Sequence, residues 1–463
     1  MFKKIEIWIL YLVLLLGMLS AVGFGVLVRQ GIEGDTKLGS IDISTLSKPA
    51  VFIVRLPEQF LRVLLKPNPY RVNDPWDDER EFFKQDGFDG IPNSEESYLL
   101  LSRHNGDLLE GVVELIDLTN FEVLHTWNPD IDAFNDLVEQ TNEFKYLNRD
   151  KNNSRGILVH PKLLQDGHLL FQDDTPFRKI DACSNLVFQN TDDIFHHSIE
   201  TDIDGNIWVP SHIYPQSIPI EKVGRNIPSD NGFNDDAIVK LSANGEILFK
   251  KSVSQIFIDN GLEYLLFAQG NAFNADPIHL NDIQPINFDG DFWKKGDIFL
   301  SIRSQSMVIL YRPSTNQIIW KGTGPFFSQH DVDILDEYRI SIFDNNSKYF
   351  AYDSIVDGHN QVIIYDFKTN EYSSYLKDSL IENDVRTTWQ GRSQILINGD
   401  LFIEETNYGR TLYFNADGSL RWTHVNLADN GNVYAVGWSR ILYTKEDIQT
   451  VNNFLTNKGT CNE

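Results

Sequence analysis

Four short segments of the chain carry residue types that suit nucleophilic group transfer. A neutral imidazole is a nucleophile near pH 7, an arginine binds charged oxygens through a planar fork of N–H donors, and an asparagine amide donates without adding charge. A lone histidine is more often a hydrogen-bonded structural residue, so the prediction depends on several segments meeting. The segments are Phe195-His196-His197-Ser198, Asp276-Pro277-Ile278-His279-Leu280-Asn281-Asp282, Ile298-Phe299-Leu300-Ser301-Ile302-Arg303 and Gln329-His330-Asp331-Val332.

The three segments that contain histidine each stand a few residues before a predicted strand. In a β-propeller, such positions tend to lie at one end of the inner strands, around the central channel. Because His196, His197, His279 and His330 come from successive regions of the chain, we predict that they share a pocket. Whether His196 or His197 faces that pocket is left open, and His212, which has no motif around it, is interpreted as a structural or surface residue.

Short apolar strands and glycine-containing turns alternate from about Ser97 onward. Asn-Gly and Asp-Gly pairs tolerate the positive φ of tight hairpin turns. They occur at Asn105-Gly106, Asp166-Gly167, Asp204-Gly205, Asn244-Gly245, Asn398-Gly399 and Asp417-Gly418. Hairpins in such a long run must stack to bury their faces, and radial stacking leaves only short edges.

The predicted fold class is therefore all-β, a six-bladed β-propeller. Residues 97–445 give roughly 58 residues for each of six blades, somewhat long but compatible with loop insertions. Five or seven blades also fit the spacing. A β-sandwich explains the turns but not so long a run of hairpins.

The N-terminus predicts a transmembrane helix. Lys3 and Lys4 precede an uncharged apolar run from Ile7 to Val28, which ends at Arg29. A helix of this length spans roughly 33 Å, enough for the hydrocarbon core of a bilayer. A cleaved signal peptide is the alternative, but the run is longer than a signal peptide needs, so we favour an uncleaved single-pass anchor. The lysines predict a cytoplasmic N-terminus and an exoplasmic (periplasmic, extracellular or luminal) C-terminal domain.

Four regions follow from these patterns. Residues 1–30 are the anchor, 31–96 an amphipathic segment and connector, 97–445 the propeller and 446–463 a C-terminal tail. Within the second region, residues 51–66 carry charges and a proline, which predicts a short amphipathic helix rather than a second span.

Two cysteines, Cys183 and Cys461, are too few for a disulfide framework or a cysteine-based zinc site. A bridge between them would have to tie the tail back to the middle of the chain, so we expect two free thiols.

The formal charge of −26, from 66 acidic and 40 basic residues, limits the partners. Such a surface repels nucleic acid and anionic lipid, which excludes both as ligands of the domain. Any anion site must therefore depend on local cations and hydrogen-bond donors.

Five segments, in order, resemble the arylsulfotransferase family. HHSIETDIDGN resembles the family's double-histidine element, DPIHLNDIQPI its H-x-N element and WKKGDIFLSIRSQSMVIL its strand with a pocket arginine. WKGTGPFFSQHDVDIL with ISIFDNN resembles the element that holds the nucleophilic histidine, and GRSQILINGDLFIEETNYGRTLYFNADGSLRWTHVN the closing blade. The ordered set covers residues 97–445 and is more specific than any one element.

The resemblance implies a six-bladed propeller that moves a sulfuryl group from a phenolic sulfate ester to a phenol, with no nucleotide donor or other cofactor. It implies His330 as the nucleophile that becomes sulfated, His279, Asn281 and Arg303 as ligands of the sulfuryl oxygens, and His196 or His197 as a further catalytic histidine. Such chemistry needs fixed donors for charge on the equatorial oxygens, as phosphoryl transfer does.

Two other functions remain open. A non-catalytic binding or assembly propeller at the membrane is one, because a fold does not fix a function; a protein partner or a homo-oligomer would then be expected. A metalloenzyme with histidine ligands is the other, although Arg303 among the histidines would repel a cation. Under the sulfotransferase interpretation no metal is expected.

Overall fold

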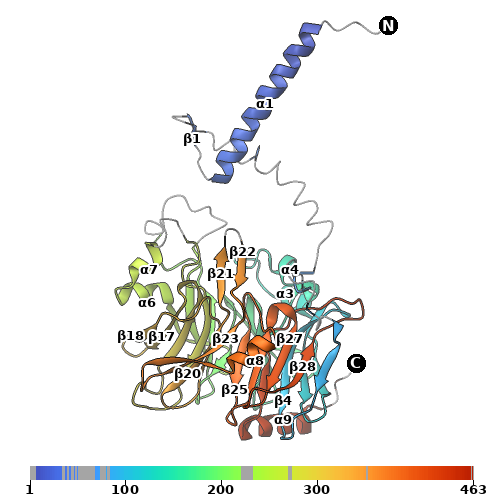
Figure 1. Ribbon diagram of the computed structural model, residues 1–463, viewed down its shortest axis with the longest axis vertical. Helices are drawn as coiled ribbons and strands as arrows, with labels where there is room; N and C mark the ends of the chain where they lie inside the picture. Colours follow the sequence, from blue (N-terminus) through green and yellow to red (C-terminus); the bar gives the residue numbers. More distant parts are fainter. Residues whose placement is uncertain are drawn as a thin grey trace. The chain divides into compact units, whose positions relative to one another are not determined.

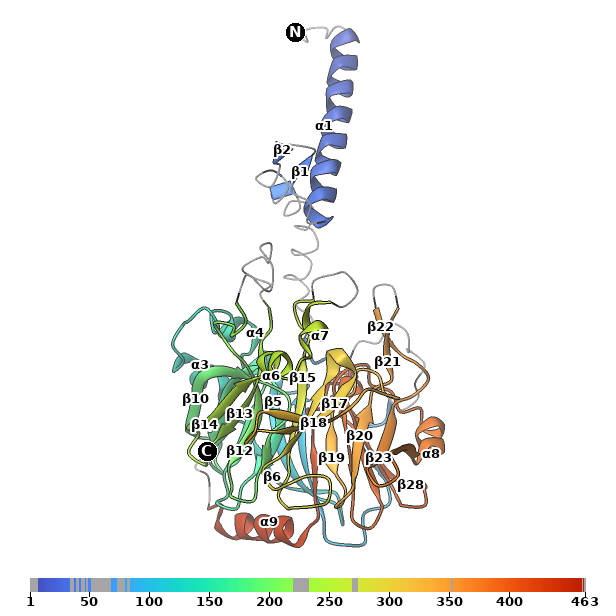
Figure 2. The same cartoon turned by 90° about the vertical axis from the view of Figure 1, so that its left-hand side faces the viewer.

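The computed structural model describes residues 7–33, 37–38, 41–42, 46, 49–50, 68–72, 80, 84–219, 233–268, 274–350, 353–459 and 461. The chain divides into two compact units, Met1–Pro69 and Tyr70–Glu463. The ribbon is drawn from two sides in Figures 1 and 2.

The first unit contains one long helix, α1 (Ile7–Glu33), as the apolar run predicts. Its segment Ile7–Arg29 has a mean hydropathy of 2.4 and is long and apolar enough to cross a membrane, a test that a signal sequence also passes. Two short strands, β1 (Lys37–Leu38) and β2 (Ile41–Asp42), pair after it. The predicted amphipathic helix at residues 51–66 lies outside the described residues.

The second unit is built of antiparallel sheets. Four of them have the four- or five-stranded form of a propeller blade. They are β29 (Arg440–Leu442), β4 (Tyr98–Asn105), β5 (Glu110–Asp117) and β6 (Glu122–Trp127); β15 (Leu280–Pro285), β16 (Ile298–Ile302), β17 (Met307–Arg312) and β18 (Gln317–Gly322); β19 (Val332–Ile334), β20 (Arg339–Asp344), β23 (Gln361–Asp366) and β24 (Glu371–Tyr375); and β25 (Arg392–Ile395), β26 (Leu401–Glu405), β27 (Arg410–Phe414), β28 (Leu420–Val425) and β3 (Gly87–Gly90).

One further sheet has eight strands. They are β7 (Val159–Leu163), β8 (Leu169–Gln172), β9 (Thr175–Ile180), β10 (Leu186–Phe195), β11 (Glu200–Thr201), β12 (Ile207–His212), β13 (Asp236–Leu241) and β14 (Ile247–Ser252). Only two residue pairs, Ile194↔His212 and Phe195↔Ser211, join β10 to β12. The prediction of an all-β, propeller-like domain is confirmed, and the count of six blades stays a prediction.

Neighbouring sheets are held together by apolar side chains between them. Phe343 and Val362, from β20 and β23, form one buried cluster with Ile403 and Leu412, from β26 and β27. Each such side chain stabilises the fold by about 1.5–3 kcal/mol when it leaves water. The stacking therefore buries the face that a single hairpin sheet would leave exposed.

Short helices and one hairpin cap the two ends of the sheets. α3 (Ile131–Asp136), α4 (Leu147–Asp150), α6 (Val253–Asp259) and α7 (Glu263–Phe267) lie at one end, together with the hairpin β21 (Ser347–Phe350) and β22 (Asp353–Val356) (Figures 1 and 2). The helix α9 (Lys445–Asn457) lies at the opposite end, and α8 (Lys377–Glu382) follows β24.

The two ends of this unit are paired into each other's sheets. β3, from the start, pairs with β28, and β29, near the end, pairs with β4. The region predicted as a connector therefore contributes a strand. The region predicted as a tail begins in α9, which Thr444 and Asp447 cap and which buries Val451 and Phe454.

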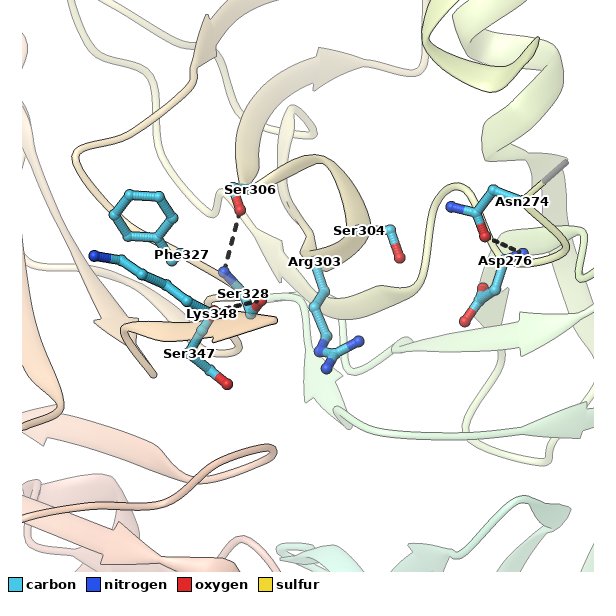
Figure 3. A pocket seen from close by; sticks show the side chains of 9 residues that line it. All are labelled: Asn274, Asp276, Arg303, Ser304, Ser306, Phe327, Ser328, Ser347 and Lys348. Carbon is cyan, nitrogen blue, oxygen red and sulfur yellow. Dashed lines mark hydrogen bonds between the residues drawn. The ribbon is translucent and has the colours of Figure 1, made fainter. Parts of the chain in front are cut away.

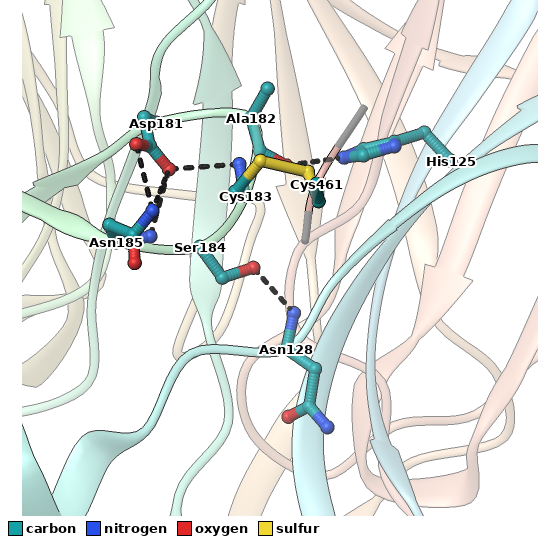
Figure 4. Close-up of a disulfide and its surroundings, with 8 residues drawn as sticks. All are labelled: His125, Asn128, Asp181, Ala182, Cys183, Ser184, Asn185 and Cys461. Carbon is teal, nitrogen blue, oxygen red and sulfur yellow. Dashed lines mark hydrogen bonds between the residues drawn. A yellow bond between two sulfur atoms is a disulfide. The ribbon is translucent and has the colours of Figure 1, made fainter. Parts of the chain in front are cut away.

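The expectation of two free thiols is wrong, because Cys183 and Cys461 form a disulfide (Figure 4). The 278 residues between them separate the two cysteines only along the sequence. Packing of α9 brings Cys461 to the turn before β10, where Cys183 lies. His125 contacts the same turn through Ala182 O, 2.8 Å away (Figure 4).

Candidate functional site

Two adjoining cavities lie at the end of the sheets that carries α6 and α7. The smaller, about 290 Å³, is rich in histidine and carboxylate side chains. The larger, about 590 Å³, is lined by serines, Phe327 and Lys348 (Figure 3). Asp276 and Arg303 line both. The full lining of the smaller cavity is Asp174, His196, His197, His212, Asn234, Asp236, Asp276, His279, Arg303, His330, Trp389 and Gln390.

His330 is buried and held by both sides of its ring. It precedes β19, and its backbone N–H donates to Phe343 O on β20. On the ring, Nδ1 lies 2.6 Å from Asn345 Oδ1 and 3.1 Å from Ser328 O. Both partners are acceptors here, so Nδ1 carries the hydrogen and the lone pair is on Nε2.

The lone pair of Nε2 accepts a hydrogen bond from the Gln390 backbone N–H at 2.9 Å. Gln390 has φ of +57° and follows Trp389, whose side chain is half exposed on the cavity wall. The nucleophilic atom of His330 is thus covered by one backbone donor.

Arg303 and His279 are brought together by pairing of β15 with β16. The Arg303 N–H donates to His279 O at 3.0 Å, directly beyond the paired strand ends. In Figure 3 the Arg303 side chain lies between the Ser328 and Lys348 side of the larger cavity and its Asp276 side. His279 Nδ1 lies 2.5 Å from Asp276 Oδ2, which makes an imidazole–carboxylate pair at the cavity wall.

The two histidines that the sequence could not separate have different surroundings. The His197 ring centre lies 5.4 Å from that of His279 and 6.1 Å from that of His330. His196 stacks instead on His212, with 4.2 Å between ring centres. His197 is therefore the one whose ring lies among the other predicted histidines.

Asn281 lies away from this group. It is fully buried on β15, and its Nδ2 donates to Gln329 O at 2.9 Å. Asn281 is not among the described residues that line either cavity. It contacts the backbone next to His330 rather than the cavity.

Burial and neighbouring cations keep the central imidazoles neutral. Burial first, then Arg303 and His279, holds the pKa of His330 well below the ordinary value. Burial and the neighbouring histidines do the same to the pKa of His197. A neutral ring keeps a lone pair available, so His330 retains nucleophilic character at neutral pH.

Carboxyl groups lie beneath the histidines. Asp331 Oδ2 accepts from Ser393 N–H at 3.1 Å and lies 3.7 Å from Arg392 Nε. Asp282 Oδ2 accepts from Val332 N–H at 3.0 Å. Burial and the nearby Asp331 raise the pKa of Asp282 to about 8. These groups fix the backbone that directly follows His330.

Several residues of the cavity were missed by sequence reasoning. Asn345, whose amide reaches His330, lies in the segment ISIFDNN but was not predicted as a site residue. His212 and Asp236 stand opposite each other in β12 and β13, a relation that only the strand register shows. His212, interpreted as structural or surface, lines the cavity.

The chain is similar to solved structures that are distant from it in sequence. A protein of unknown function from Bacteroides caccae is 13% identical, with 74% of this chain and 98% of that chain covered and a TM-score of 0.42. The WD40 domain of Pan2 from Neurospora crassa is 9% identical, with 75% and 97% covered and a TM-score of 0.40. None of the curated proteins compared with the chain matches it.

Comparison of the sequence with models of protein families identifies a family. The sequence model of the arylsulfotransferases (ASST) matches residues 160–427, the stretch that contains His196, His197, His279, Arg303 and His330. This match covers more than half of the chain, so the protein belongs to the arylsulfotransferase family.

Proposed function

We propose that this protein transfers a sulfuryl group from a phenolic sulfate ester to a phenolic acceptor through a sulfated His330. The observation that carries the proposal is the ring of His330. Its Nδ1–H donates to Asn345 and Ser328, so the lone pair is on Nε2. Gln390, which covers Nε2, lines the smaller cavity together with His330.

In the first displacement, the Nε2 lone pair of His330 attacks sulfur. The N–S bond forms as the S–O bond to the aryl group breaks, and the phenolate leaves with that electron pair. A proton from His279 neutralises the phenolate, with Asp276 Oδ2, 2.5 Å from Nδ1, holding the ring. Before attack, the Gln390 N–H must move off Nε2, so substrate entry is expected to shift the segment around Trp389.

In the second displacement, the acceptor oxygen attacks sulfur and the N–S bond breaks. The electron pair returns to Nε2, and the phenol proton passes to His279, which restores the starting state. Two easier displacements replace one difficult transfer.

Arg303, His279 and His197 are proposed to hold the sulfuryl oxygens. Arg303 lines both cavities and supplies a permanent cation with several N–H donors. Fixed donors of this kind stabilise charge that spreads over the equatorial oxygens. Asn281, predicted as a further ligand, is proposed instead to be a positioning residue, because its amide holds the Gln329 backbone beside His330.

The aryl groups are proposed to occupy the larger cavity. Phe327, which is 44% exposed, lines this cavity together with the polar side chains of Ser304 and Ser306. A flat apolar ring is a suitable surface for stacking a phenyl group. The mixed lining does not favour one phenol over another.

We further propose six blades and an exoplasmic domain. The eight-stranded sheet counts as two blades if it is divided at the two-pair junction of β10 and β12. The disulfide supports an oxidising compartment, and α1 then serves as the anchor on the way to it.

The test uses full-length protein in detergent, 4-nitrophenyl sulfate as donor and phenol as acceptor. Without acceptor, the wild type should release about one equivalent of nitrophenolate and retain ³⁵S from labelled donor, and His330→Ala should do neither. His168→Ala is the matched control. His168 pairs with Asp166, two residues before it, and lines neither cavity. Equal labelling of the wild type and His330→Ala would remove His330 as nucleophile, and no transfer by the wild type would favour a binding propeller.

A further inference from the structure

A second cluster lies in the wall of the smaller cavity, beside the histidines that the proposed reaction uses. It consists of His196, His212 and Asp236. We infer that these three side chains form a binding site for a divalent transition-metal ion, with His196 Nε2, His212 Nδ1 and Asp236 Oδ1 as ligands. Metal binding at this cluster does not depend on the proposed sulfuryl transfer.

The distances between the three atoms suit a shared ion. Asp236 Oδ1 lies 2.9 Å from His212 Nδ1 and 3.3 Å from His196 Nε2, and all three atoms lie within 4.8 Å of one another. Ligands at about 2.0–2.2 Å from a zinc-like ion stand about 3.3–3.6 Å apart at tetrahedral angles and about 2.8–3.1 Å apart at right angles. The three atoms therefore surround a position that an ion could occupy.

Their directions do not suit hydrogen bonds. Within the described residues, none of the three atoms makes a hydrogen bond, although Asp236 is fully buried and His196 is 2% exposed. Buried polar atoms normally have a partner, and three such atoms converging on one point need a common one. A metal ion would satisfy all three at once.

Two of the three ligands have a partner on their other polar atom, which fixes their orientation. Asp236 Oδ2 accepts from Leu280 N–H at 2.9 Å. His196 Nδ1 lies 2.8 Å from His197 Nδ1. Metal-bound histidines almost always have such a partner on the second ring nitrogen.

The ligands come from rigid and adjacent strand ends. His196 follows β10, His212 ends β12, and Asp236 begins β13, where the register places it opposite His212. Sites built on strands keep their geometry better than sites on loops. His212 keeps 33% of its side chain exposed, which leaves one side of the cluster open to the cavity.

The local charge favours a cation. The charged groups that act most strongly on His212 are the carboxylates of Asp236, Asp174 and Asp276. Arg303, which argued against metal binding from sequence, acts on His330 and is not among the charged groups that act most strongly on His196 or His212. Two nitrogen ligands and one carboxylate are typical of catalytic zinc sites and of non-haem iron sites.

A bound ion would also set the proton on His197. With Nε2 on the metal, His196 carries its hydrogen on Nδ1 and donates it to His197 Nδ1. His197 must then carry its own hydrogen on Nε2, as a donor on the side of its ring away from His196. This consequence rests on the proposed function, in which His197 binds a sulfuryl oxygen.

The test measures metal directly. The full-length protein, purified in detergent with a tag free of histidine, is incubated with ZnCl₂, freed of excess ion and analysed for zinc. About one zinc per chain is expected for the wild type, and at least tenfold less for Asp236→Asn and His212→Gln. Co²⁺ in place of zinc should give visible d–d absorption in the wild type but not in Asp236→Asn or His212→Gln.

Two controls keep the result interpretable. His168→Gln, a histidine paired with a carboxylate outside both cavities, should bind zinc as the wild type does. His330→Ala should also keep its zinc, so that a failure of sulfuryl transfer is distinguished from a failure of metal binding. Less than about 0.1 zinc per wild-type chain, or equal zinc in Asp236→Asn, His212→Gln and the wild type, would overturn the inference; His212 is partly exposed, so His212→Gln keeps the test valid if Asp236→Asn fails to fold.

Discussion

The Nδ1 atom of His330 lies 2.6 Å from Oδ1 of Asn345. The orientation of this amide is fixed, because its Nδ2 donates to the backbone oxygens of Thr387 and Gln390. Asn345 therefore presents its oxygen to His330 and holds the hydrogen on Nδ1. Asn345 therefore acts on His330 in two ways. It orients the imidazole ring, and it holds the Gln390 backbone that covers Nε2.

Asn345→Ala is expected to lower the rate of nitrophenolate release in a single turnover by about 100-fold or more, since the ring loses its fixed tautomer and orientation. Substrate binding should change much less. The control is Asn346→Gly, because Asn346 contacts Asp357 O and His359 O, has φ of +48° and does not contact His330. Equal rates in Asn345→Ala and the wild type would contradict the positioning role.

The pH dependence follows from the lowered pKa of His330. Burial, Arg303 and His279 lower it, so the ring stays neutral as the pH falls through 6.5. The acid limb of kcat/KM should therefore lie below pH 6.5 in the wild type. Arg303→Met removes one cause, so the limb should move to higher pH while the rate at pH 7.5 also falls. A wild-type limb at or above pH 6.5 would show that His330 is not held neutral.

Replacement of Asp282 is expected to stabilise the folded protein at alkaline pH. Its pKa is raised to about 8 by burial and by Asp331, so the folded state binds a proton that the unfolded state releases above about pH 4. Stability is therefore lost as the pH rises through that window. Asp282→Asn removes this loss, and its Tm should exceed that of the wild type at pH 8, with the difference shrinking toward pH 4. Asp429→Asn, at an exposed position, should show no such trend.

The disulfide predicts a loss of stability on reduction. Removal of a native disulfide typically costs about 2–5 kcal/mol, because the unfolded chain regains conformational freedom. Cys183→Ser and Cys461→Ser should lower Tm equally, and the double variant no further. Reductant should lower the wild-type Tm to the same value and leave the variants unchanged. A wild-type Tm insensitive to reductant would contradict a stabilising bridge.

Replacement of Phe327 is expected to weaken binding of the aryl sulfate. Phe327→Ala removes the exposed ring from the larger cavity and should raise KM for 4-nitrophenyl sulfate several-fold, with a smaller effect on kcat. Phe288→Ala is a matched control, because Phe288 is also partly exposed, at 36%, and lines neither cavity. An unchanged KM would remove the larger cavity as the aryl site.

The sequence predicted those parts of the site that depend on strand ends. His279, Arg303 and His330 stand next to strands that hairpin turns delimit, and such ends gather in a propeller. Asn281 could not be placed in the same way. Side chains alternate along a regular strand, but His279 has φ of +51° and the pairing of β15 is irregular between Leu280 and Asp282, so the alternation is interrupted.

Other features depend on contacts that the order of residues does not show. His212 and Asp236 meet through strand register, and Cys183 meets Cys461 through the packing of α9. The choice between His196 and His197 needed the geometry of the turn after β10, where His197 has φ of +58° and the two rings lie at 85° to each other. Neither motif spacing nor composition contains that information.

The bridge between Cys183 and Cys461 also changes how the protein would respond to a protease. A cut in any loop between these two cysteines leaves two fragments that are still covalently joined. On a denaturing gel without reductant the nicked chain would therefore still run as one species, and only reduction would release the fragments. A single cut in such a loop would thus not release the C-terminal half of the chain.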